Sequence, residues 1–296
     1  MSPRVWRHPW LRHLRLPFNV LLSPIYLWGA WLAPFEPDPL RLLLGWLALH
    51  VFLYGGTTAL NSVFDRDEGP IGGMRHPEPV GPGLLAWSVV VQVAGLPLAW
   101  LVGPAFLISY VLLGLVAAAY SLPWTRWKAR PRAALLAVAL GQGGVGSLAG
   151  WWAAAGPTVA PLSELTGWGP GWAAAVAALV LIGQYVASQA YQVDEDRRRG
   201  DLTLPVLVGP ARALRLALLP AAAGALGLFG TVAWQAGWLW ALPGALLGAL
   251  LAVRQVRWSR RVGRAGVDAD YRDAMALLRL GGLGLSAYLL ALLLFA

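Results

Sequence analysis

The sequence has no cysteine and carries little charge. Without cysteine, the chain forms no disulfide, holds no metal through thiolates and has no cysteine nucleophile. Only 12% of its 296 residues are charged, whereas soluble domains have roughly 25%. Hydrophobic residues make up 58% of the chain, so we expect an all-α polytopic membrane protein, with one integral-membrane domain over residues 1–296.

Long apolar runs predict about nine membrane-spanning helices around a central cavity that opens to the cytoplasmic side. The predicted spans are 17–34, 40–60, 83–102, 104–121, 133–154, 171–190, 213–232, 235–253 and 275–295.

The charged residues of the loops indicate the topology. All of the 23 Arg and Lys residues except Arg41 fall on one side of the predicted spans, which the positive-inside rule makes cytoplasmic. With an odd number of spans, the N-terminus lies in the cytoplasm and the C-terminus lies outside the cell inner membrane. The net charge of +9 is therefore a topology signal that also attracts anionic lipid, and it does not indicate a nucleic-acid partner.

Two short polar clusters interrupt the apolar sequence, and they have the same pattern. In each, an amide residue lies four positions before an Asp-Arg pair: Asn61 precedes Asp65, and Gln192 precedes Asp196. On a helix the amide and the acid share one face. Both clusters end predicted spans on the cytoplasmic side, where carboxylates near lipid usually face a cavity, an ion or a substrate.

Polar stripes at helical spacing lead to both clusters. The stripe of the second span is Tyr54, Thr57, Thr58, Asn61, Asp65 and Glu68, and that of the sixth is Gln184, Ser188, Gln192 and Asp196. Hydrogen bonding between helices explains the Ser and Thr positions well. It does not explain several acids at one helix end, so these favour a ligand site.

Basic residues crowd the same predicted side as the acids. They are Arg66, Arg75, Arg126, Lys128, Arg197 and Arg198. Carboxylate and amide oxygens suit Mg²⁺, which commonly bridges a few carboxylates to phosphates. Acids, a metal ion and basic residues together indicate a polyanionic ligand, and a phosphate-bearing molecule is the simplest choice.

The motifs and span count resemble those of the UbiA-type superfamily of intramembrane prenyltransferases, in a divergent form similar to 4-hydroxybenzoate polyprenyltransferases. Its signatures, N-D-x-x-D-x-x-x-D and D-x-x-x-D, end the second and sixth helices. Asn61 and Asp65 match the first signature, and Asp196 matches the last acid of the second. Gly69 stands in place of an acid of the first signature, for which Glu68 is the expected substitute, and Gln192 replaces the first acid of the second.

The resemblance implies Mg²⁺-dependent transfer of an isoprenyl group from a prenyl diphosphate to a lipophilic acceptor, aromatic or polyene, within the membrane. It implies the metal ligands Asn61, Asp65, Glu68, Gln192 and Asp196, and the catalytic residues Asp65, Asp196 and Lys128. The diphosphate would contact Arg66, Arg75, Arg126, Lys128 and Arg197. An allylic cation would be stabilised by Tyr54, Tyr120, Tyr185 and Tyr191.

Two other classes of function stay open at this point. A secondary transporter also places acids around an intramembrane site, although its site is expected near the midplane rather than at the cytoplasmic edge. A non-catalytic membrane scaffold of the same fold would explain why Gly69 and Gln192 replace acids. The sequence specifies neither the acceptor, nor the donor chain length, nor the oligomeric state.

Overall fold

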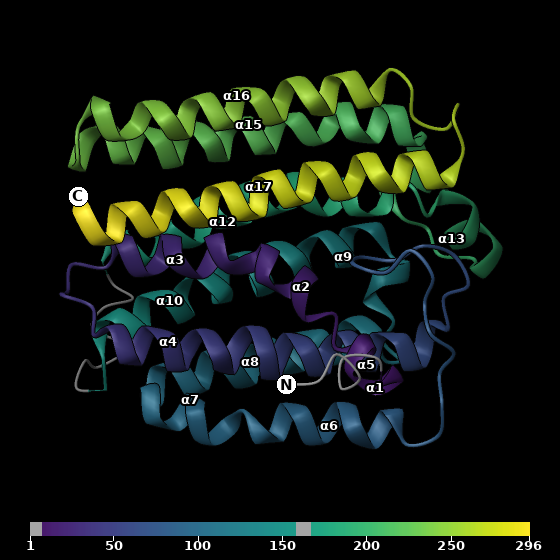
Figure 1. The fold of residues 1–296 in the computed structure, drawn as a ribbon, viewed down its shortest axis with the longest axis horizontal. Helices are drawn as coiled ribbons and strands as arrows, with labels where there is room; N and C mark the ends of the chain where they lie inside the picture. The colour runs from purple at the N-terminus through teal and green to yellow at the C-terminus, as the bar shows by residue number, and fades with distance from the viewer. Residues whose placement is uncertain (1–7, 158–166) are drawn as a thin grey trace.

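The computed structural model describes residues 8–157 and 167–296, and in these ranges it is a bundle of helices that run along one common direction (Figure 1). The described residues contain no β-strand, and their β pairing is limited to an isolated bridge between Ile71 and Met74. The expected all-α membrane fold is therefore confirmed.

Eight helical stretches are long and apolar enough to cross a membrane. They are Pro39–Asp65, Leu84–Val102, Pro104–Ser121, Pro131–Ala155, Trp168–Gln189, Pro210–Gln235, Trp238–Ser259 and Val267–Phe295. A further helical stretch runs beside them, made of α2 (Leu16–Asn19), η2 (Val20–Leu22) and α3 (Ser23–Leu32). It covers the first predicted span, so the expectation of about nine spans agrees with the fold.

Several stretches are built from consecutive elements. The first is α4 (Pro39–Leu47), η3 (Ala48–Leu53) and α5 (Tyr54–Asp65); the second is α6 (Leu84–Ala94) and α7 (Leu96–Val102); the fourth is α9 (Pro131–Leu136), η5 (Ala137–Val145) and α10 (Gly146–Ala155). The others are α8 (Pro104–Ser121), α12 (Trp168–Gln189), α15 (Pro210–Gln235), α16 (Trp238–Ser259) and α17 (Val267–Phe295). The short helices are α1 (Pro9–His13), η4 (Trp127–Ala129), α13 (Val193–Arg199) and α14 (Leu204–Val208).

The helix ends follow local chemistry as well as hydropathy. Proline lies in the first turn of α4, α8, α9 and α15, where its missing N–H is not needed. Asp38 caps α4 by accepting a hydrogen bond from the Leu40 N–H at 2.9 Å. The last helix begins at Val267 rather than near residue 275, because its charged first turns extend beyond the apolar run that hydropathy detects.

Glycines bring α3 and α10 into backbone contact at the centre of the bundle. A Cβ on Gly29 would lie 1.8 Å from the Ser147 carbonyl oxygen, and one on Gly150 would lie 1.8 Å from the Tyr26 carbonyl oxygen. Small residues allow such close approach between membrane helices. On another side of α3, Trp28 donates a hydrogen bond to the Ala173 carbonyl of α12 at 3.1 Å, so α3 links α10 to α12.

Both polar clusters lie at one end of the bundle. The end of α5, helix α13 and the start of α17 are found there, opposite the C-terminus (Figure 1). The chain therefore gathers the residues of the two motifs at a single membrane surface, which the sequence predicts to be cytoplasmic.

The glycine contact between α3 and α10 gives a test of the packing. We expect Gly150→Ala to lower the free energy of unfolding by about 1–3 kcal/mol, because the added methyl group overlaps the Tyr26 carbonyl oxygen. The matched control is Gly230→Ala on α15, where nothing lies within 4 Å of the new methyl group. Thermal unfolding in detergent should show a large loss for the first variant only, and equal melting temperatures would contradict the packing.

Candidate functional site

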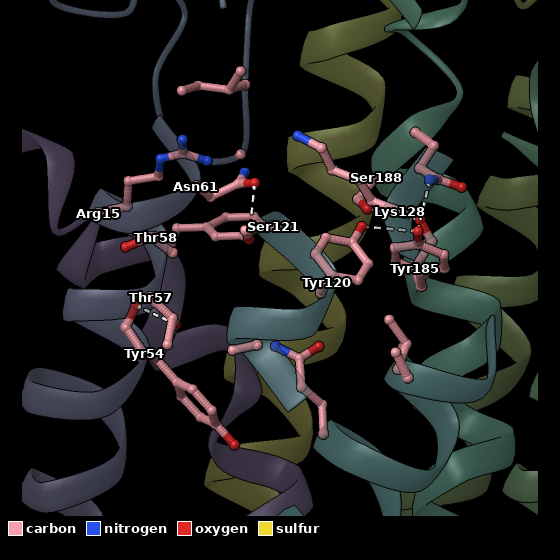
Figure 2. A pocket seen from close by; sticks show the side chains of 18 of the residues that line it. Arg15, Tyr54, Thr57, Thr58, Asn61, Tyr120, Ser121, Lys128, Tyr185 and Ser188 are labelled. Carbon is pink, nitrogen blue, oxygen red and sulfur yellow. Dashed lines mark hydrogen bonds between the residues drawn. The ribbon is translucent and has the colours of Figure 1, made fainter. Parts of the chain in front are cut away.

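A cavity of about 270 Å³ lies inside the bundle and reaches the end that carries α13. Its walls come mainly from α5, α8, η5 and α12, and η4 and α13 border its charged part. Asn61, Asp65, Gln192 and Asp196 all line it, together with Lys128. Figure 2 shows several of the lining side chains, which reach the cavity from separate helices. The structure thus brings the amide and acid of both polar clusters into one space.

Asp65 and Lys128 form an ion pair at the charged part of the cavity. Both side chains are only 8% exposed. Lys128 is the only lysine of the chain, and η4 holds it in place because Leu202 N–H bonds the adjacent Ala129 carbonyl at 3.0 Å. Burial lowers the pKa of the Lys128 ammonium to about 8, and the charge of Asp201 opposes that fall. Lys128 therefore still carries its proton at neutral pH.

Asp196 faces the same space from the first turn of α13. Thr203 donates a hydrogen bond to its carboxylate at 3.0 Å, and Asp201 N–H bonds its backbone carbonyl at 2.9 Å. Burial raises the pKa of the Asp196 carboxyl to about 6, although the Thr203 hydrogen bond opposes the rise. Gln192 is the residue that precedes α13, so its side chain enters the cavity from the helix start.

An ion triad that is largely shielded from solvent joins the loop after α5 to α13. Arg199 donates to Asp67 at 2.6 Å and to Glu195 at 2.6 Å. The Glu195 carboxylate also accepts a hydrogen bond from the Glu68 backbone N–H at 2.9 Å. Asp67 and Arg199 both line the cavity. The triad therefore places one more acid and one more cation at the mouth of the cavity, which is the charged part where the cavity reaches the end of the bundle.

Arg15 enters the cavity from the N-terminal side. Its backbone has the left-handed conformation (φ 47°) just before α2, and its side chain is buried. Its guanidinium donates to the Ser62 hydroxyl at 2.8 Å, while its Nε has no hydrogen-bond partner. Ser62 directly follows Asn61 on α5, and Figure 2 shows the Arg15 and Asn61 side chains in the same part of the view. A buried cation with an unsatisfied N–H suits an anionic ligand.

Four tyrosines expected at the cavity do line it: Tyr54, Tyr120, Tyr185 and Tyr191. The hydroxyls of Tyr120 and Tyr185 share a hydrogen bond of 2.9 Å, and Gln189 donates to the Tyr185 hydroxyl at 2.8 Å. These contacts fix two aromatic side chains in the lining of the cavity (Figure 2).

The expectation that Glu68 shares one helical face with Asn61 and Asp65 is wrong. Helix α5 ends at Asp65, and Arg66 follows in the left-handed conformation (φ 48°), so the helical face of Asn61 and Asp65 does not extend three residues further. Glu68 is exposed and does not line the cavity; Asp67 does. Gly69 and Pro70, which disfavour helix, were the available signal for this end.

Four of the expected diphosphate contacts lie outside the cavity lining. Arg66 and Arg197 are exposed, Arg75 pairs with Asp268 near the start of α17, and Arg126 makes two hydrogen bonds to Asp201, of 3.0 and 3.1 Å. Two of these arginines, Arg75 and Arg126, pair with acids of other segments, so the structure does not bring them to the cavity.

Sequence reasoning missed several lining residues: Arg15, Asp67, Arg199, Asp201 and Thr203. Arg199 follows Asp196 by three positions, so helical spacing selects it over Arg197. No local signal distinguishes Arg15 from the other N-terminal arginines, because a left-handed backbone turns it inward.

Two departures from the family signature have local partners. A Cβ on Gly69 would lie 2.7 Å from a Glu195 carboxylate oxygen, so an acid at 69 would require the Glu195 side chain to move. Ser62 stands where the signature has its first Asp, and its hydroxyl accepts the hydrogen bond of Arg15.

The donor set fits Mg²⁺ held jointly with a ligand. In residues 8–157 and 167–296, no group of three or more His, Cys, Asp or Glu side chains is arranged to hold a metal ion by itself. The two motifs instead bring two carboxylates, Asp65 and Asp196, and two amides, Asn61 and Gln192, to the cavity. Mg²⁺ typically takes one or two carboxylates, keeps several waters and completes its shell with phosphate oxygens.

The ion triad predicts different roles for two neighbouring arginines of α13. Arg199→Ala should lower the free energy of unfolding by about 2–3 kcal/mol, because it leaves Asp67 and Glu195 without their cation. Arg197→Ala, the matched control, removes an exposed pair with Asp194 and should change it by no more than about 0.5 kcal/mol. Unfolding of both variants in detergent measures the difference, and equal losses would contradict the triad.

Comparisons with known proteins identify the family of the chain. A model of the UbiA prenyltransferase family matches residues 22–269. None of the curated proteins matches the sequence. A UbiA homologue from Archaeoglobus fulgidus bound to DMAPP and Mg²⁺ is 17% identical with a TM-score of 0.65, over 98% of this chain and 100% of that one.

Two further solved structures have the same fold. An apo UbiA homologue from Aeropyrum pernix K1 is 22% identical with a TM-score of 0.65, over 91% of this chain and 97% of that one. A digeranylgeranylglyceryl phosphate synthase is 15% identical with a TM-score of 0.60, over 95% and 97%. The family match covers most of the chain, and the chain therefore belongs to the UbiA prenyltransferase family, as an integral membrane protein.

Proposed function

We propose that this protein transfers an isoprenyl group from a prenyl diphosphate to a lipophilic acceptor, with Mg²⁺ as cofactor. The observation that carries the proposal is the meeting of Asp65, Asp196 and Lys128 in one cavity with apolar walls. Two of the similar structures are bound to DMAPP with Mg²⁺ and to GPP with Mg²⁺, which supports a prenyl diphosphate as the donor.

The charged part of the cavity suits the diphosphate. Asn61, Asp65, Gln192 and Asp196 would hold Mg²⁺, which when bound neutralises charge on the leaving diphosphate. Lys128 now neutralises Asp65, and once the acid has another cation its ammonium is free to bind a phosphate oxygen. Preorganised positive charge of this kind stabilises a leaving anion with little reorganisation.

Arg15 and Arg199, which also line the cavity, add fixed positive charge. Arg15 has an N–H without a hydrogen-bond partner, and Arg199 is held by two acids, so both guanidinium groups are positioned before a ligand arrives. Guanidinium groups bind phosphate oxygens in a fork geometry, which fixes orientation as well as charge. We assign to these two the role that the sequence suggested for Arg66, Arg75, Arg126 and Arg197.

The apolar walls suit the isoprenyl chain. Leu53, Leu113, Val138 and Leu181 line the cavity and exclude water from the reacting carbon. When the allylic C–O bond breaks, its electron pair leaves with the diphosphate, and the carbon becomes positive. The ring faces of Tyr120 and Tyr185 would stabilise that charge by up to about 2 kcal/mol. The acceptor then bonds to the carbon and releases a proton.

The charged end of the bundle would face the cytoplasm. The positive-inside rule favours this orientation, with the N-terminus inside and the C-terminus outside the cell inner membrane. A water-soluble diphosphate would then reach the acids directly, while the hydrocarbon part enters the bilayer.

The two acids give the direct test of this function. Asp65→Asn and Asp196→Asn should each lower Mg²⁺-dependent diphosphate release from a prenyl diphosphate at least about 100-fold, because each removes anionic charge from the metal site. Asp194→Asn is the matched control, since Asp194 lies on the same helix, exposed and paired with Arg197. Diphosphate release is measured on purified protein in nanodiscs, with a lipid extract added as the source of the acceptor.

A full rate in either variant would refute the metal site. Solute counterflow in liposomes without diphosphate release from the wild type would favour the transporter, and the absence of both activities would favour the scaffold.

Gln192 gives a gain-of-charge test. Gln192→Asp should lower the Mg²⁺ concentration that gives half-maximal rate, because a third carboxylate would face the ion. A titration of rate against Mg²⁺ measures the shift, with Glu68→Gln as a control at an exposed acid of the same end. An unchanged Mg²⁺ requirement would show that Gln192 points elsewhere.

A further inference from the structure

Helices α15 and α16 form an outer hairpin whose surface is mostly left to lipid. Of the eight stretches in the described residues that are long and apolar enough to cross a membrane, these two are the least buried. They pack side by side at the outer edge of the bundle, and the loop after α16 lies at the end that carries α13 (Figure 1). The Gln255 amide donates to the Leu214 carbonyl at 2.8 Å, so these two positions lie at the same depth in the membrane.

Exposed arginines gather near that depth, two from each helix. They are Arg212 and Arg215 on α15, and Arg254 and Arg257 on α16. At 1.5 Å per residue, the backbones of Arg212 and Arg257 both lie about 3 Å from the level of this hydrogen bond, toward the charged end of the bundle. Those of Arg215 and Arg254 both lie about 1.5 Å from it on the other side. The hairpin therefore gathers its four arginines within about 5 Å of membrane depth.

The acids at the start of α17 are engaged elsewhere. Asp268 pairs with Arg75, and Asp273 pairs with Arg261. Asp270 accepts two hydrogen bonds, one from the end of α16 and one from the loop after it. Among the described residues, none of the four hairpin arginines forms an ion pair. Their positive charge is therefore open to an anion from outside the chain.

Exposed leucines continue the helix faces that carry these arginines. On α15, Leu219 and Leu226 follow Arg212 by seven and fourteen positions, so they share its face. On α16, Leu246 precedes Arg257 by eleven positions, which is three helical turns. Leu219 is 71% exposed and Leu246 is 63% exposed. Each helix therefore presents an apolar face that ends in arginine at the charged end of the bundle.

We propose that Arg212, Arg215, Arg254 and Arg257 bind the headgroup of an anionic phospholipid, whose acyl chains lie along the leucine faces of α15 and α16. Guanidinium groups bind phosphate oxygens in a fork geometry, and basic pockets at the end of a helix bundle suit acidic headgroups. The leucine faces assign the phosphate to a lipid rather than to a soluble ion, because only a lipid would use both surfaces. The four arginines, all in the described part of the chain, lie outside the cavity lining, so the proposal does not depend on the proposed reaction.

Arginines at a membrane edge can also serve only to orient their helices. Orientation depends on the number of positive charges on each side of the membrane, and it requires no preference for one lipid headgroup over another. A headgroup site predicts such a preference, and it predicts that the preference depends on where the arginines lie. These two properties separate the explanations.

Headgroup preference is measured on purified, delipidated protein in a neutral detergent at one ionic strength. Native mass spectrometry gives the Kd values of phosphatidylglycerol and phosphatidylcholine that carry the same acyl chains. The wild-type protein should bind phosphatidylglycerol at least about tenfold more tightly, because several arginines act on one headgroup. The double variant Arg212→Gln with Arg257→Gln should lower this preference to about twofold.

The matched control is Arg197→Gln with Arg198→Gln. It removes the same charge from exposed arginines at the same end of the bundle, but on α13, outside the membrane-spanning helices, and it should keep the tenfold preference. Arg215→Gln with Arg254→Gln serves where the first double variant does not fold. Equal affinity of the wild type for the two lipids would overturn the site, as would an equal loss of preference in the hairpin and control variants.

A water-soluble phosphate separates a lipid site from a site for a free anion. Glycerol 3-phosphate carries the phosphate of the headgroup without acyl chains. An excess of it, at constant ionic strength, should leave phosphatidylglycerol bound to the wild-type protein, because it cannot occupy the leucine faces. Complete displacement of the lipid would overturn the assignment to a phospholipid.

Discussion

Ionised side chains at the edge of a hydrocarbon layer must be paired, and this constraint shapes the mouth of the cavity. Three acids there contact cations from other segments: Asp65 with Lys128, Asp67 with Arg199, and Asp201 with Arg126. Breaking such a pair leaves a costly isolated charge. The loop after α5, η4 and α13 are therefore held together by their charges, and the mouth is complete only when all three are in place.

The bundle below the mouth is held by a different kind of contact. α3 and α10 touch through glycines, which leave their backbones almost no space, and the Trp28 indole connects α3 to α12. Tight apolar packing fixes the helices, whereas charge fixes the loops. A ligand with one anionic end and one hydrocarbon end fits this arrangement. Its anionic end would meet the charged mouth of the cavity, and its hydrocarbon end would meet the apolar walls.

Hydropathy and spacing predicted the spans and the four motif residues, because a helix continues through Asn61 and Asp65 and restarts next to Gln192. The same spacing failed at Glu68, where a left-handed residue ends α5. Which of the loop arginines line the cavity could not be predicted, for another reason. Which of them faces inward depends on the acids that neighbouring loops offer, and for Arg15 on a backbone conformation that sequence does not encode locally.

Glu195 has a consequence for how this branch could change. Its carboxylate fills the space beside Gly69 and also accepts from Arg199 and from the Glu68 backbone. An aspartate at 69 would displace this carboxylate and weaken its hydrogen bonds to Arg199 and to the Glu68 backbone. The two positions are therefore coupled, and the effect of an acid at 69 should depend on which residue occupies position 195.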